Sequence, residues 1–154
     1  MKKSNLEKEN RGVPQACMLC LLSALSLACG GGGGGSADTP TQTIEGVISD
    51  PAIQNATVTL YRLDGTSLGL TGTSGSDGSF KIENVPGGDL KNYKLVGTGG
   101  VDVVTGESFD EIQLSAPMGM FTTEAAVISP LTSLVSAELG TDASNLDAAI
   151  EAIK

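Results

Sequence analysis

Two different spacings of apolar residues divide the chain after residue 42. From Thr43 to Ser129, apolar and polar residues alternate in short runs, and clusters of Gly, Asp, Asn and Pro separate the runs. This pattern is typical of half-buried strands joined by tight turns. Runs of about four to eight residues, spaced about 10 to 12 residues apart, predict a small antiparallel β-sandwich of about seven strands.

Turn signals place the individual strands. Asp64-Gly65 follows one apolar run and predicts a type I′ hairpin turn, in which both central residues have a positive φ. Asp77-Gly78 predicts a second hairpin. Further along, the apolar residues that we expect in strands are Val101, Val103, Val104, Phe109, Ile112 and Leu114.

The spacing becomes helical after residue 129. Ser129-Pro130 is a favourable pair for an N-cap and first helical position. An amphipathic helix ending at Gly140 is predicted from Leu131, Leu134, Val135 and Leu139. A second helix is predicted from Leu146, Ala149, Ile150 and Ile153. We expect both stripes to be packed rather than to bind a partner, and we expect sequence beyond residue 154 to cover the second stripe.

The first 28 residues combine a basic start with a short apolar run. Lys2, Lys3, Lys8 and Arg11 precede the run from Cys17 to Ala28. A helix of that length rises about 18 Å, whereas a bilayer core is about 30 Å thick. A removable signal peptide therefore fits residues 1–28 better than a membrane span does.

The end of this run, Leu25-Ser26-Leu27-Ala28-Cys29, resembles the lipobox of bacterial lipoproteins. The resemblance implies that Cys29 is lipidated, begins the mature chain and attaches it to a membrane. Gly30, rather than Asp, after this Cys resembles the pattern that directs lipoproteins to the outer membrane. We therefore expect the outer membrane or cell surface rather than the inner membrane. An ordinary secretory signal, with Cys29 as a bystander, is the alternative.

Residues 29–42 have the composition of a tether. Six consecutive glycines, Gly30 to Gly35, follow Cys29. Because such a tract has no side chains to bury, it is expected to be a flexible coil. A tether of this length has a root-mean-square span of about 20 Å, enough to hold a domain clear of lipid headgroups.

Composition limits the chemistry of the folded part. The chain has no His, which removes the commonest general base and the Cys/His zinc sites. Nine basic residues stand against 18 acidic ones, for a formal charge of −9. Such a charge repels nucleic acid and anionic headgroups, so we expect no nucleic-acid partner. Without a His, a serine hydrolase triad is unsupported, and we expect no enzyme activity.

The densest group of carboxylates surrounds the Thr105-Gly106 turn. Ca²⁺ prefers six to eight oxygen ligands, so these side chains are candidate metal ligands. They are Asp102, Glu107, Asp110 and Glu111. Their spacing does not match an EF-hand, and a hairpin whose acids face water is the favoured interpretation. We therefore expect no cofactor, with calcium as the alternative.

The order of motifs from residue 43 to residue 139 resembles a known family. The residues that carry the resemblance are Ala56, Val58 and Leu60, then Ser74, Asp77, Gly78 and Phe80, and finally the sequence VISPLTSLV. They resemble the transthyretin-like sandwich of carboxypeptidase regulatory-like and Cna-B-type domains. The resemblance implies an accessory, stalk or adhesion module without an active site of its own.

These observations predict four segments: a signal peptide at 1–28, a lipidated Cys and linker at 29–42, a sandwich at 43–129 and a helical segment at 130–154. The predicted function is that of a lipid-anchored, non-catalytic adhesion, stalk or structural module of the cell envelope. Expected partners are the membrane, through Cys29, and a surface protein or glycan. The alternatives are a periplasmic carbohydrate- or peptide-binding lipoprotein and the N-terminal accessory domain of a longer surface enzyme.

Overall fold

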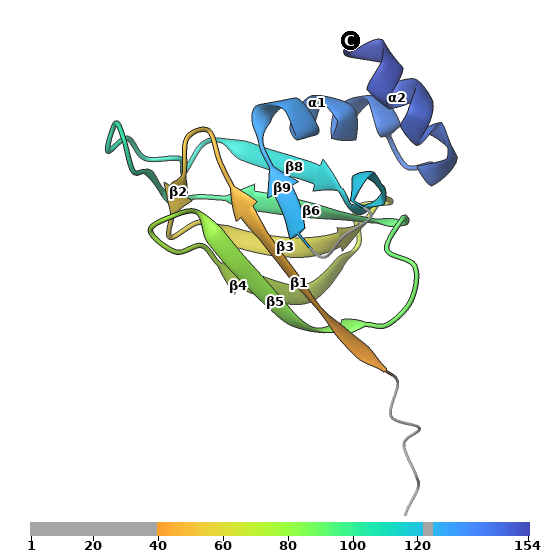
Figure 1. Ribbon diagram of the computed structural model, residues 1–154, viewed down its shortest axis with the longest axis horizontal. Coiled ribbons are helices and arrows are strands. Elements are labelled where there is room, and N and C mark those ends of the chain that lie inside the picture. Colours follow the sequence, from red (N-terminus) through yellow and green to blue (C-terminus); the bar gives the residue numbers. More distant parts are fainter. Residues whose placement is uncertain (1–39, 122–124) are drawn as a thin grey trace, which may run out of the picture. The chain divides into compact units, whose positions relative to one another are not determined.

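The computed structural model describes residues 40–121 and 125–154, which are mainly β (Figure 1). Residues 1–28 and Cys29 lie outside this part of the chain. A three-stranded sheet has the order β5 (Ser79–Pro86), β1 (Thr41–Ile48), β9 (Ala125–Ile128). A four-stranded sheet has the order β4 (Ser67–Thr73), β3 (Thr57–Arg62), β6 (Tyr93–Thr98), β8 (Gln113–Pro117). A short pair joins β2 (Ile53–Gln54) to β7 (Val101–Asp102).

The two larger sheets bury a common core, because alternate residues of their strands point inward. Along β1, Ile44 and Ile48 are buried while Glu45 and Val47 are not. The largest fully buried aliphatic side chains are Ile44, Ile48, Ile53, Leu60, Ile82, Leu95 and Ile128. This confirms the predicted small β-sandwich, with seven strands of four or more residues among the described residues.

One pairing differs from an all-antiparallel sandwich. β9 runs parallel to β1, with partners from Glu45↔Ala125 to Ile48↔Ile128. The two strands approach closely at Gly46, where an added Cβ would lie 2.3 Å from the carbonyl oxygen of Ala126. A glycine at this position therefore allows β9 to pair with β1 as the edge strand of the sheet.

The first predicted hairpin turn is not of type I′. Gly65 has φ of 90°, but Asp64 is not among the described non-Gly residues with positive φ, which are Asn55 and Asn84. Asp64 instead accepts a hydrogen bond on Oδ1 from the Thr66 backbone N, at 2.8 Å. The backbone N of Gly65 donates to the Arg62 carbonyl (3.0 Å), and that of Arg62 donates to the Thr66 carbonyl (2.8 Å). The loop therefore has three residues rather than two, and in such a loop only the last residue, here Gly65, needs a positive φ.

Helix α1 (Pro130–Leu139) begins at the predicted N-cap, Ser129. Its predicted apolar stripe is wrong in part, because Val135 is buried while Leu131 is 60% and Leu134 56% exposed. The first turn explains this orientation. The Thr132 hydroxyl donates to the carbonyl of Ser115 on β8 (2.9 Å), so the hydroxyl side of the helix, not the leucine side, faces the sheet.

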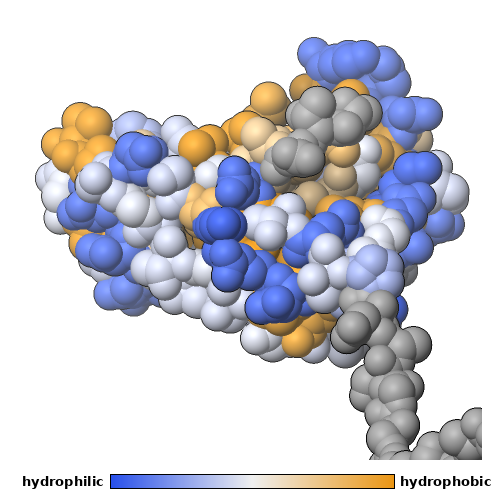
Figure 2. Space-filling view, turned by 60° about the horizontal axis from the view of Figure 1, so that its bottom comes forward, coloured by the Kyte–Doolittle hydropathy of each residue, from blue (hydrophilic) through white to orange (hydrophobic). Residues whose placement is uncertain are grey.

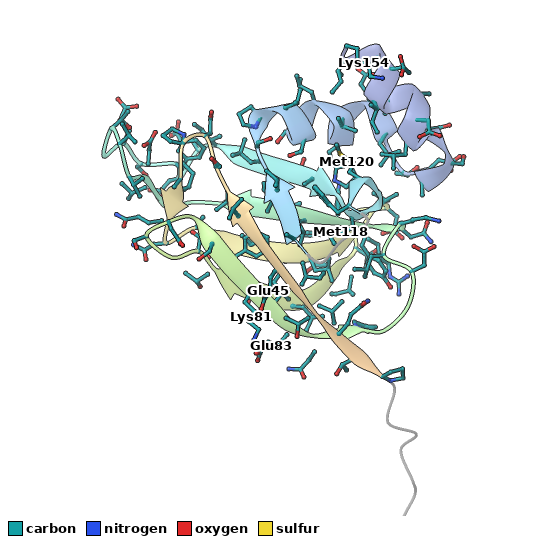
Figure 3. All side chains as sticks on the ribbon, in the orientation of Figure 1. Glu45, Lys81, Glu83, Met118, Met120 and Lys154 are labelled. Atoms are coloured by element: carbon teal, nitrogen blue, oxygen red, sulfur yellow. The ribbon has the colours of Figure 1, made fainter. Side chains whose placement is uncertain are left out.

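The C-terminal segment continues through short 3₁₀ helix η2 (Ala143–Asn145) to α2 (Leu146–Ala152). The second predicted stripe packs against α1 and against Leu63, in a cluster separate from the sandwich core. These contacts bury Ala149 and leave Leu146, Ile150 and Ile153 partly buried, so our expectation that sequence beyond residue 154 covers the rest of the stripe stays a prediction. The 3₁₀ helix η1 (Met118–Met120) joins the two regions: Met118 belongs to the sandwich core, and Met120 packs with the helices (Figure 3).

No helix in residues 40–121 and 125–154 is long and apolar enough to cross a membrane.

Candidate functional site

The strands define two ends of the sandwich. Strand β1 starts beside Pro86 at the end where the described chain begins, which we call the tether end. At the opposite end, Thr57 pairs with both Thr73 and Thr98. The segments that follow these strands therefore gather there, and Figure 1 shows one of them protruding from the sandwich. We call this the loop end; its segments are 49–56, 74–78 and 99–112.

The loop at 99–112 is fixed at its base. Its β7 residue Asp102 pairs with Ile53 of β2, and the Val103 backbone N donates to the Ala52 carbonyl at 3.0 Å. Phe109 is buried in the sandwich core, and its backbone N donates to the Gly100 carbonyl at 2.9 Å. The loop is thus built on a hydrogen-bonded base and an aromatic anchor.

Asp102 shapes the tip of this loop. Its Oδ1 accepts hydrogen bonds from the backbone N of Val104 (2.7 Å) and of Thr105 (3.1 Å). The hydrogen bond from Val104 is the main reason why the pKa of Asp102 lies below its ordinary value of 3.8, although partial desolvation acts in the opposite direction. This carboxylate oxygen is therefore engaged by the turn itself.

The other three candidate calcium ligands are exposed on the same loop. Glu107, Asp110 and Glu111 have exposed side chains. The part of the chain that the structure describes holds no group of three or more His, Cys, Asp or Glu side chains arranged to bind a metal ion. The loop thus carries the four acids close in sequence without assembling them into such a group, and the prediction that no cofactor binds stays a prediction.

The tip also exposes two aliphatic side chains. Val103 is 41% and Val104 is 75% exposed, and Ile112, at the far end of the loop, is exposed as well. The alternating pattern had placed both valines in a strand, but β7 ends at Asp102 and residues 103–105 form a turn. Two adjacent valines directly before Thr105-Gly106 are the signal that could have found this tip, because neighbouring strand residues cannot both face inward.

Charge is distributed unequally between the two ends. The loop-end segments hold six acidic residues and no Lys or Arg: Asp50, Asp77, Asp102, Glu107, Asp110 and Glu111. The tether end holds Arg62, Lys91 and Lys94 together with Asp64 and Asp89, and the helical segment that packs there adds Lys154 and four acids, Glu138, Asp142, Asp147 and Glu151. The difference is therefore that the tether end carries both signs of charge, whereas the loop end carries only acids. Within the tether end, the Arg62 guanidinium lies over the Tyr93 ring, 5.7 Å from its centroid, and Lys91 pairs with Asp89 at 3.4 Å.

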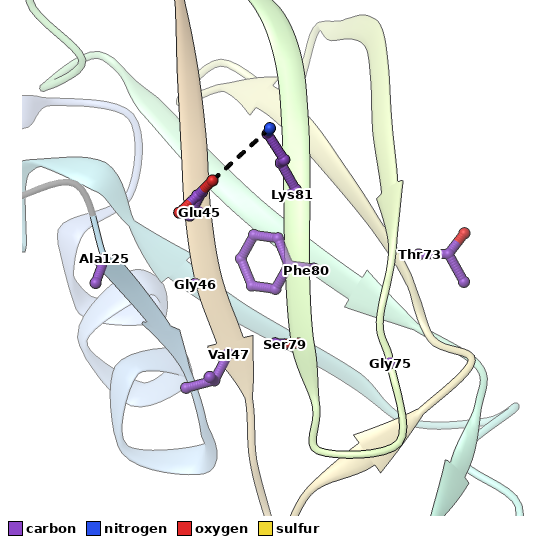
Figure 4. A pocket seen from close by; sticks show the side chains of 9 residues that line it. All are labelled: Glu45, Gly46, Val47, Thr73, Gly75, Ser79, Phe80, Lys81 and Ala125. Atoms are coloured by element: carbon purple, nitrogen blue, oxygen red, sulfur yellow. Dashed lines mark ion pairs between the residues drawn. The ribbon is translucent and has the colours of Figure 1, made fainter.

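A shallow groove of about 590 Å³ lies on the three-stranded sheet (Figure 4). Lys81 at its edge pairs with Glu83 at 3.0 Å and with Glu45 at 3.9 Å (Figures 3 and 4). Its hydrogen bond with Glu83 is the main reason why the pKa of Lys81 is raised. Figure 2 shows hydrophilic residues beside hydrophobic ones on the face that it presents. Because Lys81 in this groove is already paired with Glu45 and Glu83, we take the loop end, rather than the groove, as the candidate site.

Comparison with protein-family models, with curated proteins and with solved structures gives no match to this chain.

Proposed function

We propose that this chain is a lipid-anchored, non-catalytic module of the cell envelope, which acts in adhesion or as a structural element. The proposal combines the lipobox-like sequence at Cys29 with the direction in which the chain joins the sandwich. Thr41, the first residue of β1, is twelve residues after Cys29. The observation that carries the proposal is that this junction lies at the end opposite loop 99–112.

An anchor at Cys29 would set the orientation of the domain. A glycine-rich tether that joins the tether end keeps this end nearer the membrane on average, while the loop end extends away from it. The charge distribution supports the same orientation. Three of the five described basic residues, Arg62, Lys91 and Lys94, are at the membrane-proximal end beside acids of that end, whereas the loop end, whose charged residues are all acidic, is kept away from anionic headgroups.

Detergent partitioning of the full chain expressed in a bacterial host tests the anchor. We expect the wild-type protein to enter the detergent phase and to incorporate an acyl label, and Cys29→Ser to remain in the aqueous phase without the label. Ser36→Ala, in the same linker, is the matched control and should behave as wild type. Partitioning and labelling that Cys29→Ser leaves unchanged would overturn the proposal.

A further inference from the structure

We propose that the tip of loop 99–112 is a docking surface for a basic segment of another protein, one in which Lys or Arg residues flank aliphatic side chains. The proposal deepens the proposed function, since an outward-facing loop end is where an anchored module meets a partner. Its central contact is Val104, and its charged rim consists of Glu107, Asp110 and Glu111.

The apolar part of this surface is not used for folding. Val104 is three-quarters exposed in the turn at residues 103–105, and its neighbour Val103 is also exposed. The loop that carries them protrudes from the sandwich (Figure 1). A single exposed valine needs no explanation, but here two adjacent valines and Ile112 emerge from one loop. Covering them with a partner would remove apolar surface from water, which is the favourable term in most protein association.

The loop already has a fixed shape before any partner binds. The Asp102 carboxylate holds the backbone N of Val104 and of Thr105, and Phe109 anchors the other arm in the core. Because little conformational freedom remains to be lost, binding at this tip has a low entropic penalty. A rigid tip is therefore better suited to docking than a mobile loop of the same composition.

Charge selects the kind of partner. The loop end carries six carboxylates, and among the described residues all five basic side chains lie elsewhere: Arg62, Lys81, Lys91, Lys94 and Lys154. A surface of this sign accelerates the approach of cationic partners and repels nucleic acids and anionic lipids. With valines at its centre, the complementary occupant is a basic segment that also presents aliphatic residues.

Binding of a synthetic peptide of alternating Lys and Val to the full chain, purified in a non-ionic detergent, tests this proposal. Fluorescence anisotropy gives the affinity, and amide shifts in a ¹⁵N spectrum locate the contact. We expect shifts confined to residues 102–112. A peptide of alternating Lys and Ser should bind at least about threefold more weakly, since it lacks the apolar term.

Variants at the tip have matched controls on the helices. Val104→Ser should weaken binding about three- to tenfold, whereas Leu134→Ser, which changes another exposed aliphatic residue, should not. The combination Glu107→Gln, Asp110→Asn and Glu111→Gln should weaken binding at low salt. The same charge change at Glu138, Asp147 and Glu151 should have less effect, since those exposed acids lie on the helical segment.

Several results would overturn the docking surface. These are equal affinity for the two peptides, equal losses in tip and control variants, shifts outside the loop end, and no binding at all. Because the binding assay runs in detergent, it does not depend on the lipid at Cys29. Failure of this proposal and failure of the anchor are therefore separate results.

Discussion

Apolar turn residues are buried at one end of the sandwich and exposed at the other. Leu63, in the turn after β3 at the tether end, is only 5% exposed, because it packs in the cluster formed by the C-terminal helices. Val104, in the turn after β7 at the loop end, is 75% exposed and has no such cover among the described elements. The helices thus complete one end of the molecule, while the other is rigid and uncovered. The difference supports our proposal that the loop end, which the helices leave uncovered, is where this chain meets a partner.

The largest effect that we predict is at the loop anchor. Phe109→Ala removes a buried ring from the core and should lower the free energy of unfolding by about 3–5 kcal/mol. Urea denaturation of the full chain measures this loss. A loss below about 1 kcal/mol would mean that Phe109 does not anchor the loop in the core and that the loop end is not rigid.

Leu63 and Val104 give a direct comparison of the two ends. Leu63→Ala should lower the free energy of unfolding by about 2–5 kcal/mol, since the side chain is buried under the helices. Val104→Ala should change it by no more than about 0.5 kcal/mol, since the side chain faces solvent. Equal losses in the two variants, measured by the same denaturation, would contradict the contrast between covered and uncovered ends.

A smaller effect, dependent on pH, is expected at Asp102. Its pKa in the folded protein is below 3.8, so its charged form stabilises the fold above that pH, and this contribution is lost as the pH falls through the lowered pKa. Asp102→Asn keeps an acceptor oxygen but has no charge. Wild type should therefore lose more stability than Asp102→Asn between pH 5 and the acid limit, in thermal melts across that range. Parallel curves for the two proteins would show that the charge has no role in the turn.

The smallest effect is expected at the tether end. Arg62→Gln removes a cation–π contact with Tyr93 on an exposed surface and should lower the free energy of unfolding by about 0.5–1 kcal/mol. A double-mutant cycle with Tyr93→Leu separates this contact from other effects of the two changes. A coupling energy near zero would remove this contact from the description of the tether end.

The sequence predicts the sandwich well because its strands are half buried, and alternation then marks the inner face directly, as Ile44 and Ile48 illustrate. The start of α1 is predicted equally well, because Ser129 as the N-cap and Pro130 as the first helical residue depend only on the local backbone conformation. By contrast, Leu131 and Leu134 face solvent because two hydroxyls of α1 bond to Ser115, a contact 17 or 18 residues away in sequence. Such long-range contacts leave no periodic signal.

The candidate site was only partly predictable for a similar reason. The acids of loop 99–112 are visible in the sequence, but the role of Asp102 in the turn depends on the local backbone conformation. Val103 and Val104 fit a strand pattern, and only the early end of β7 places them at an exposed tip. The parallel pairing of β9 with β1 also lies outside what alternation can specify, because both pairings give the same pattern.

Energy transfer from two single positions to the membrane tests the central claim, that the tether end lies towards the membrane and the loop end away from it. The lipid-anchored chain, carrying a donor dye at Val104→Cys or at Thr66→Cys, is placed in vesicles with an acceptor dye on the headgroups. Both positions are exposed, and they lie at opposite ends of the sandwich. The account predicts stronger transfer from position 66 than from position 104. Equal transfer, or stronger transfer from position 104, would contradict it.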